Sequence, residues 1–254
     1  GVVLFLLCFI GTKERISTPK EQKDNFWTAL KHLWQNDQAR LLCITGVFLL
    51  TGQVLKFTLA VYYVKYFLLR EDLITAFMTT GMVGSMLGCA LAQVLAKKMC
   101  KIKAYISLQI IAAIICIFSY FIAAEQVVLA FIAFFLWKFF LDMATPLLWA
   151  KMADAIDYGQ WKTGIRITGM VYSTIIFFIK LGVALGGALA GWALAYYGYQ
   201  ADIEQTDATK DGILLSFTLY PAIGSLIVAV VMKWYILDDS KVEQIQNELK
   251  AANS

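Results

Sequence analysis

Residues 173–191 read STIIFFIKLGVALGGALAG, a run of apolar or small residues broken by one cation, Lys180. A helix needs about 20 predominantly apolar residues to cross a bilayer core about 30 Å thick, and this run supplies them. Comparable runs fill most of the remaining chain. The sequence therefore predicts an all-α polytopic membrane protein, with spanning helices at 41–69, 73–96, 104–124, 126–153, 168–198 and 213–237.

The composition supports this class. Of the 254 residues, 60% are hydrophobic and 16% are charged, whereas an average soluble domain has about 45–50% apolar and about 25% charged residues. The five cysteines are an odd number without metal-type spacing, so they indicate no disulfide framework. A single histidine, His32, offers no multi-His site, and we expect no metal centre.

The first eleven residues, GVVLFLLCFIG, are apolar but too short to span. At 1.5 Å per residue they cover only about 16 Å. They also lack the basic start and the cleavage site of a signal peptide. We interpret them as the end of a helix that begins upstream of Gly1, which would make the chain a fragment. An interfacial segment is the alternative.

Lysine and arginine are distributed unevenly between the two sides of the predicted bundle. They concentrate on one side, in the segments 12–40, 97–103, 151–167 and the C-terminal end. The other side carries only Arg70 and Lys210. Because positively charged loops stay cytoplasmic, we expect a multi-pass protein of the plasma (inner) membrane, surrounded by lipid, with a cytoplasmic C-terminus. The net charge of +4 is an orientation signal, and no nucleic acid partner is expected.

The segment after the first apolar run begins polar and continues as NFWTALKHLWQ. Phe26, Leu30, Leu33 and Trp34 recur at helical spacing, which predicts a short amphipathic helix at the cytoplasmic membrane surface. A solvated linker is the alternative. The predicted organisation is a truncated helix at 1–11, a cytoplasmic loop at 12–40, a six-helix domain at 41–237 and a cytoplasmic tail at 238–254.

Rows of small residues four apart mark two of the helices for close packing. Inside lipid, helices associate where small side chains let the backbones approach. We therefore interpret these residues as helix contacts rather than ligand contacts. The rows are Gly84, Gly88 and Ala92, Gly182 with Gly186, and Gly187 with Gly191.

Lys180 is the cation that needs an explanation. A lysine at mid-bilayer costs at least about 2.5 kcal/mol on insertion scales, so it should face protein or water. It lies roughly 18 Å along its helix, too deep to reach the headgroups. Its helical face also holds Ser173, Phe177, Ala184 and Gly187. We interpret Lys180 as pointing into a cavity or at an acidic partner; a purely structural ion pair is the alternative.

A second polar stripe lies in the helix expected at 126–153. Lys138, Asp142, Thr145 and Trp149 follow at spacings of four, three and four, hence on one face. Pro146 has no N–H, so the carbonyl of Asp142 should lose its partner and the helix should bend. This face suits a sugar or ion path, unless Lys138 and Asp142 merely neutralise each other.

The first full helix also has a polar face near its middle. Gln53 and Lys56 are three residues apart, and Tyr63 follows one heptad after Lys56. Rings that stack on sugars and side chains that bind hydroxyls are what a carbohydrate site requires. The candidate substrate-binding residues are Gln53, Lys56, Tyr63, Lys138, Asp142, Thr145, Trp149 and Ser173.

The link at 149–169 reads WAKMADAIDYGQWKTGIRITG. Asp154 and Asp157 should lie near a helix C-terminus, where the macrodipole disfavours carboxylates. Lys162 or Arg166 is expected to compensate. Gly159 fits the position just past the helix end.

ADAIDYGQWKTGIRITG, followed by VYS and then IKLG, resembles the signature of the glycoside–pentoside–hexuronide:cation symporters. These are sugar carriers of the major facilitator superfamily, to which the melibiose carrier belongs. YYVKYFL at 62–68 is similar to their seventh helix. The resemblance implies the C-terminal six-helix bundle of such a carrier, preceded by the end of helix six and the central loop.

The resemblance also implies roles for single residues. Lys180 matches a lysine of helix eleven near the cation site. Thr145 matches a helix-ten position where the melibiose carrier has a sugar-facing tryptophan. The residues that match the cytoplasmic signature, which closes the inner gate through ion pairs, are Asp154, Asp157, Tyr158, Lys162 and Arg166.

The expected function is Na⁺- or H⁺-coupled symport of a sugar or glycoside, with no cofactor besides the coupling ion and no enzymatic activity. The family's N-terminal six helices carry the acidic cation ligands and most sugar contacts. That half is a partner that this chain lacks, so the chain alone should be inactive. The alternatives are a carrier for a non-sugar solute and an integral membrane transferase, for which Asp154 and Asp157 are the only candidate metal-binding pair.

Overall fold

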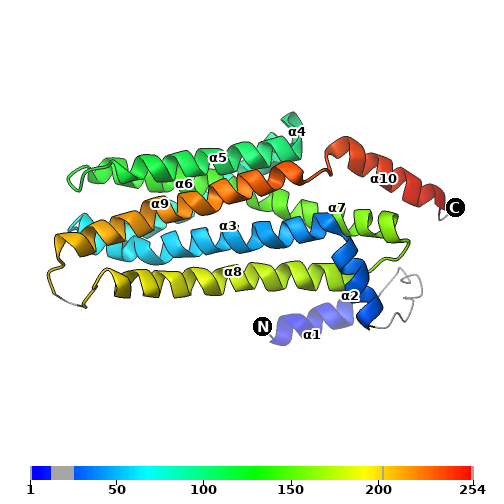
Figure 1. Ribbon diagram of the computed structural model, residues 1–254, viewed down its shortest axis with the longest axis horizontal. Coiled ribbons are helices and arrows are strands. Elements are labelled where there is room, and N and C mark those ends of the chain that lie inside the picture. Colours follow the sequence, from blue (N-terminus) through cyan, green and yellow to red (C-terminus); the bar gives the residue numbers. More distant parts are fainter. Residues whose placement is uncertain (1, 13–25, 202, 253–254) are drawn as a thin grey trace.

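The computed structural model describes residues 2–12, 26–201 and 203–252, and within these ranges it is all-helical (Figure 1). Six helical segments are long and apolar enough to cross a membrane, which confirms the predicted fold class. They run up and down the bundle in alternating directions. The six are Asp37–Phe67, Glu71–Lys98, Lys101–Tyr120, Val127–Thr163, Thr168–Tyr196 and Asp207–Trp234.

The spans are built from seven α-helices, and three shorter ones flank them. The spanning helices are α3 (Asp37–Tyr62), α4 (Ile74–Lys98), α5 (Lys101–Tyr120), α6 (Val127–Met143), α7 (Thr145–Thr163), α8 (Thr168–Tyr196) and α9 (Asp207–Val231). A π-helical turn at Tyr63–Phe67 extends α3, and 3₁₀ turns at Glu71–Leu73 and Met232–Trp234 precede α4 and follow α9. The flanking helices are α1 (Val2–Gly11), α2 (Phe26–Gln35) and α10 (Asp239–Ala252).

Helix α3 lies at the centre of the arrangement. In Figure 1, α5, α9, α3 and α8 lie side by side from top to bottom, and α6 connects α5 to α4 by packing against both. The ends of α2, α7 and α10 gather at the right-hand end of the bundle. This end also carries the basic segments around 97–103 and 151–167.

Glycines set the spacing between two helix pairs, as predicted. A Cβ added to Gly84 would lie 2.6 Å from the carbonyl oxygen of Phe135 on α6, and one on Gly182 would lie 2.6 Å from that of Val47 on α3. Gly88 and Gly186 face the same two partners. The expectation for Gly187 and Gly191 was wrong within the described residues: nothing lies within 4 Å of a Cβ at either position.

An aromatic stack fills the core. The rings of Tyr63 and Phe217 stack with centroids 4.2 Å apart, and those of Phe77 and Phe134 stack at 4.3 Å. Trp137 continues the stack from Phe134 at 5.7 Å. These side chains come from four different helical segments, so the stack holds the bundle together where no single helix pair would.

Three helix ends differ from the predicted ones: polar side chains cap two helices at earlier positions, and a glycine ends a third at a later one. Helix α3 begins at Asp37 because Asn36 accepts a hydrogen bond from the backbone N–H of Ala39. Helix α9 begins at Asp207, inside the expected loop, because Thr206 caps it in the same way. Helix α7 continues through Gly159 to Thr163, and Gly164 ends it with a left-handed φ of 72°. The prediction that Gly159 follows the helix end was therefore wrong.

The fourth span breaks where the proline predicted a bend. Helix α6 ends at Met143 and α7 begins at Thr145, with Pro146 in its first turn. The carbonyl of Asp142, four residues before Pro146, accepts a hydrogen bond from the thiol of Cys89 on α4 at 3.3 Å. A neighbouring helix thus replaces the missing backbone donor, as bilayer-buried backbone requires.

Burial is uneven among the spans. Only 22% of the most apolar window of Glu71–Lys98 and of Thr168–Tyr196 is buried, against 44–56% for the other four. Two helices, α4 and α8, therefore present most of their surface outward. In the flanking helix α2, which forms where a short helix was predicted, Leu33 is buried and Trp34 is 71% exposed.

Candidate functional site

The side chains of Lys138 and Asp142 form a buried ion pair inside the bundle. They lie one turn apart on α6, with 2.6 Å between Nζ and Oδ2, and both are about one tenth exposed. From α3, the Nε2 of Gln53 donates to the other carboxylate oxygen of Asp142 at 3.2 Å. With Cys89 on the backbone carbonyl, three helices meet at Asp142. We call Gln53, Cys89, Lys138 and Asp142 the Asp142 cluster.

The Asp142 cluster contains the ion pair between Lys138 and Asp142, which was one of the two interpretations of this stripe. It also contains the amide of Gln53, which was predicted as a substrate-binding residue. Sequence reasoning missed Cys89, although its place beside Gly88 on a helix-packing row was a usable signal. A buried pair of charges is tolerated because each charge satisfies the other, and removing one partner is strongly destabilising. The cluster offers an ammonium, a carboxylate and an amide, all groups that bind sugar hydroxyls.

Lys56, one turn after Gln53 on α3, is enclosed by aromatic rings. It is 1% exposed. Its Nζ donates to the carbonyl oxygen of Phe217 at 2.9 Å and lies 3.8 Å from the centroid of the Phe217 ring and 5.1 Å from that of Trp137. Tyr63 stacks on the same Phe217 ring. The structure therefore places Lys56 and Tyr63 in the bundle core, and their predicted part in sugar binding remains a prediction.

Of the three remaining candidates, two lie at the outer surface of the bundle. Trp149 is 43% exposed and its ring lies 6.4 Å from that of Tyr172. Ser173 is exposed and donates to the carbonyl of Met170 at 3.1 Å. Thr145 is half-buried at the start of α7. Within the described ranges, none of the three hydrogen-bonds to the Asp142 cluster, so the break at Ala144 separates the two halves of the predicted stripe.

Lys180 is exposed near the middle of α8. Gly182 and Gly186 pack against α3, and at 100° per residue Lys180 lies on the far side of α8 from them. It forms no hydrogen bond or ion pair with any residue that the structure describes. The ion pair that was the alternative for Lys180 is therefore not formed within these residues. Its ammonium group points away from this bundle.

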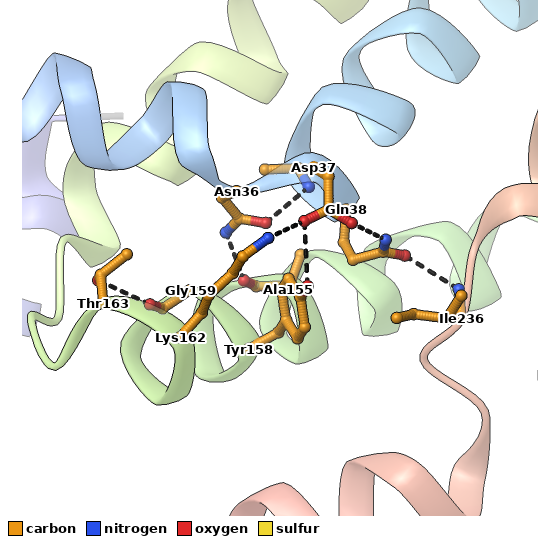
Figure 2. A network of polar contacts seen from close by, with 10 residues as sticks. Asn36, Asp37, Gln38, Ala155, Tyr158, Gly159, Lys162, Thr163 and Ile236 are labelled. Atoms are coloured by element: carbon orange, nitrogen blue, oxygen red, sulfur yellow. Dashed lines mark hydrogen bonds and ion pairs between the residues drawn. The ribbon is translucent and has the colours of Figure 1, made fainter.

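A second polar site lies where α3 begins and α7 ends (Figure 2). The hydroxyl of Tyr158 donates to Oδ1 of Asp37 at 3.0 Å, and the Nζ of Lys162 donates to the same oxygen. Gln38 donates its amide to Oδ2. Two residues of the predicted cytoplasmic gate thus meet at Asp37, which sequence reasoning missed. Its position directly after the capping residue Asn36 was the available signal.

The neighbours of Asp37 connect this site to two other elements. The Nδ2 of Asn36 donates to the carbonyl of Ala155 on α7 at 2.8 Å, and a Cβ on Gly159 would lie 2.6 Å from that Nδ2. The Oε1 of Gln38 accepts the backbone N–H of Ile236, between α9 and α10, at 3.0 Å. Gly159 therefore serves close approach, and α3, α7 and the C-terminal segment are tied together.

Of the remaining predicted gate residues, Asp157 on α7 pairs with Arg166, which follows the end of that helix. Arg166 donates to Asp157 at 3.0 Å, which confirms that a basic residue compensates this carboxylate. Gln246 of α10 donates to the second oxygen of Asp157 at 3.2 Å. Asp154 takes no part in an ion pair with the described residues. Nearby, hydrogen bonds from Gln244 and Trp161 lower the pKa of Glu248.

Comparison with known proteins identifies the family. A family model described as MFS/sugar transport protein matches residues 1–239. The chain belongs to this family. It is 34% identical, over 98% of its length, to the inner membrane symporter YicJ of Escherichia coli (strain K12), and covers 55% of that protein. It is 30% identical over 98% of its length to YagG of the same organism, provisionally named a glycoside/cation symporter, and covers 54% of it. The chain therefore spans about half the length of these relatives.

Solved structures agree on the fold. The outward-facing crystal structure of FucP, a major facilitator superfamily transporter, superposes with a TM-score of 0.71 at 16% identity, over 93% of this chain and 52% of FucP. The MFS/sugar transport family and this neighbour are transporters and not enzymes, so the family does not support the transferase alternative. The six apolar spans and the family together indicate a multi-pass membrane protein.

Proposed function

We propose that the chain is the C-terminal half of a cation-coupled symporter, which moves a sugar or glycoside inward with Na⁺ or H⁺. The observation that carries the proposal is the Asp142 cluster: charged and amide side chains held inside apolar spans of a member of a sugar transport family. Ionisable residues within membrane helices mark transport paths, because their insertion is otherwise costly. The length matched in the relatives, about half, supports the assignment to one half of a carrier.

The depth of the polar residues supports a transport site. Gln53, Asp142 and Lys180 each lie within three residues of the midpoint of their spans, Asp37–Phe67, Val127–Thr163 and Thr168–Tyr196. Substrate and coupling-ion sites of secondary transporters lie near the bilayer midplane, at the interface of two repeats. In the proposed complex, a sugar hydroxyl replaces Gln53 at Asp142, while Lys138 keeps the carboxylate charged and oriented.

We propose that Lys180 takes part in cation coupling, from the face of α8 that turns toward the N-terminal half of the carrier. Its ammonium has no partner among the described residues, and α4 and α8 are the least buried spans. A second six-helix half that packs against these helices would supply the missing partner, an acidic group whose charge a bound cation changes. Alternating access then follows from rocking of one half against the other around the midplane site.

The site at Asp37 is proposed as part of an inner gate. The end of the bundle that holds it also carries the lysine-rich segments, which supports a cytoplasmic position for this end and for α10. Asp37, Tyr158 and Lys162 hold the end of α7 against α3. Asp157 and Arg166 pair with each other at the same end of the bundle.

Uptake into proteoliposomes tests the proposal. The natural full-length protein should accumulate labelled glycosides when an inward Na⁺ or H⁺ gradient is imposed, and a panel of sugars, peptides and drugs separates substrate classes. Accumulation of a sugar driven by either gradient supports the proposal. Transport of a non-sugar solute alone, or sugar equilibration without response to either gradient, contradicts it.

A further inference from the structure

An apolar groove of about 470 Å³ lies between α3, α8 and α9, away from the Asp142 cluster. Its volume falls within the range of about 300–1,000 Å³ typical of ligand sites. On α8 its lining residues lie in the last turns before the loop to α9, whereas on α3 and α9 they lie at or near the middle of the spans. The side chains that line its outer part are Phe48, Leu189, Trp192, Tyr196, Tyr220 and Ile223.

The floor of the groove is formed by a close helix contact. Gly52 of α3 and Gly224 of α9 lie there, and a Cβ on Gly224 would lie 3.0 Å from the carbonyl oxygen of Phe48. The two helices touch at backbone level, and larger side chains on either side form the walls. The groove is therefore a shaped depression and not a gap left by loose packing.

The lining offers almost no free polar group to a ligand. The hydroxyl of Thr51 donates to the carbonyl of Gly182 at 3.1 Å, and the hydroxyls of Tyr197 and Tyr220 bond to each other at 2.7 Å. Among the lining side chains this leaves two polar groups at the rim, the hydroxyl of Tyr196, which is 83% exposed, and the indole N–H of Trp192, which is 66% exposed. A sugar or an ion would lose its hydrogen bonds to water here without replacement, whereas a hydrocarbon chain would not.

The position of the groove indicates whether it opens to lipid or to water. On α8, Leu189, Trp192 and Tyr196 lie between 120° and 180° around the helix from Lys180, at about 100° per residue. If Lys180 faces the other half of the carrier, as the proposed function holds, the groove opens to lipid. Trp192 is 66% exposed, and exposed tryptophan and tyrosine near helix ends mark the membrane interface.

We propose that this groove binds one acyl chain of a membrane phospholipid, with the headgroup end of the lipid at Tyr196. The proposal rests on the proposed function for the direction in which the groove opens. Apolar walls, satisfied hydroxyls and an aromatic rim match a hydrocarbon chain that ends at the interface. The bound lipid ties α3, α8 and α9 together on the side opposite Lys180.

Native mass spectrometry of the natural full-length protein, purified in mild detergent, tests this site. Ala193 lines the groove, and Ala195, exposed on the same helix, does not. The wild type and Ala195→Phe should each retain one phospholipid per chain, while Ala193→Phe, which fills the groove, should lower the retained fraction at least fivefold. Equal retention in the two variants, or none in the wild type, would overturn the proposal.

Two further arms separate other outcomes. Ile223→Trp fills the groove from α9 and should lower retention in the same way, which covers the case in which Ala193→Phe does not fold. If either filling variant instead converts a dimer to a monomer without changing lipid retention, the occupant is a second copy and the lipid proposal is wrong. Gradient-driven sugar uptake by the wild type is measured in parallel. Lipid retention without sugar uptake contradicts the proposed function, whereas sugar uptake without lipid retention contradicts only the groove proposal.

Discussion

The Nζ of Lys56 lies 2.9 Å from the carbonyl oxygen of Phe217, the carbonyl that Pro221 leaves without its helical donor. A proline inside a helix removes the N–H that would bond four residues back. Lys56, from α3, replaces that donor inside α9. Cys89 does the same for the carbonyl of Asp142, four residues before Pro146. Both prolines in these spans are thus matched by a side chain from another helix.

This relationship predicts an energetic coupling between Lys56 and Pro221. Lys56→Met leaves the Phe217 carbonyl without a donor, whereas Pro221→Ala returns the backbone N–H. Leaving a buried acceptor unsatisfied costs about 1–3 kcal/mol, so Lys56→Met should cost that much less in the Pro221→Ala background than in the wild type. Unfolding of the four proteins in detergent measures the cycle. Equal costs in both backgrounds would show that Lys56 does not serve this carbonyl.

The Asp142 cluster predicts a separation of stability from transport. Asp142→Leu leaves Lys138 buried without its partner and should destabilise the protein by about 3–5 kcal/mol. The double variant Lys138→Met/Asp142→Leu removes both charges and should recover most of that stability. Sugar uptake should nevertheless stay abolished in the double variant. A stable double variant with normal uptake would reduce the pair to a structural role.

The site at Asp37 predicts an effect on transport rate with little effect on stability. Asp37 and Lys162 are 34% and 40% exposed, and such pairs contribute about 0–1 kcal/mol. Asp37→Asn weakens the contacts with Tyr158 and Lys162 and should change the rate of sugar exchange by several-fold. Asp72→Asn is the matched control, because it removes an exposed ion pair with Arg70 at the opposite end of the bundle. Equal effects of the two variants would contradict a gate role for Asp37.

The N-terminus of α10 predicts a pH dependence. The backbone N–H of Lys241 and the hydroxyl of Ser240 lower the pKa of Asp238 below its ordinary value of 3.8. Because the folded form has the lower pKa, the cap stabilises α10 above the unfolded pKa and is lost as pH falls through the folded one. The protection of α10 amides from hydrogen exchange, taken relative to the intrinsic rate at each pH, should therefore fall below about pH 4. Asp238→Ala should show lowered protection already at neutral pH, for a cap worth about 1 kcal/mol. Protection factors in the wild type that do not change with pH would contradict this.

The sequence predicted the parts of the fold that depend on apolar length and on glycine. The six spans, the break near Pro146 and the contacts of Gly84 and Gly182 are confirmed because bilayer thickness and backbone approach leave few alternatives. The helix ends were harder to predict from the sequence. Asn36 and Thr206 cap helices at positions that hydropathy reads as loop, since a capping bond depends on one side chain and not on a pattern.

The candidate site was predicted only where partners are close in sequence. Lys138 and Asp142 lie one turn apart, so their pairing follows from helical spacing. Gln53 was identified as a polar residue within an apolar helix, but its contact partner Asp142 lies 89 positions away in the sequence. Lys162 and Asp37 are 125 positions apart. Such pairings depend on how helices pack. For the same reason Lys56 and Tyr63, predicted on a polar face, lie in the aromatic core.

Cation-stimulated sugar uptake by a Lys180→Cys variant of the natural full-length protein tests the central claim most directly. Leu185→Cys, another exposed position on α8, is the control for a cysteine in this helix. If Lys180 faces the other half and takes part in coupling, Lys180→Cys should lose the stimulation by Na⁺ or H⁺ while Leu185→Cys keeps it. Stimulation of the same size in both variants and in the wild type would contradict the account.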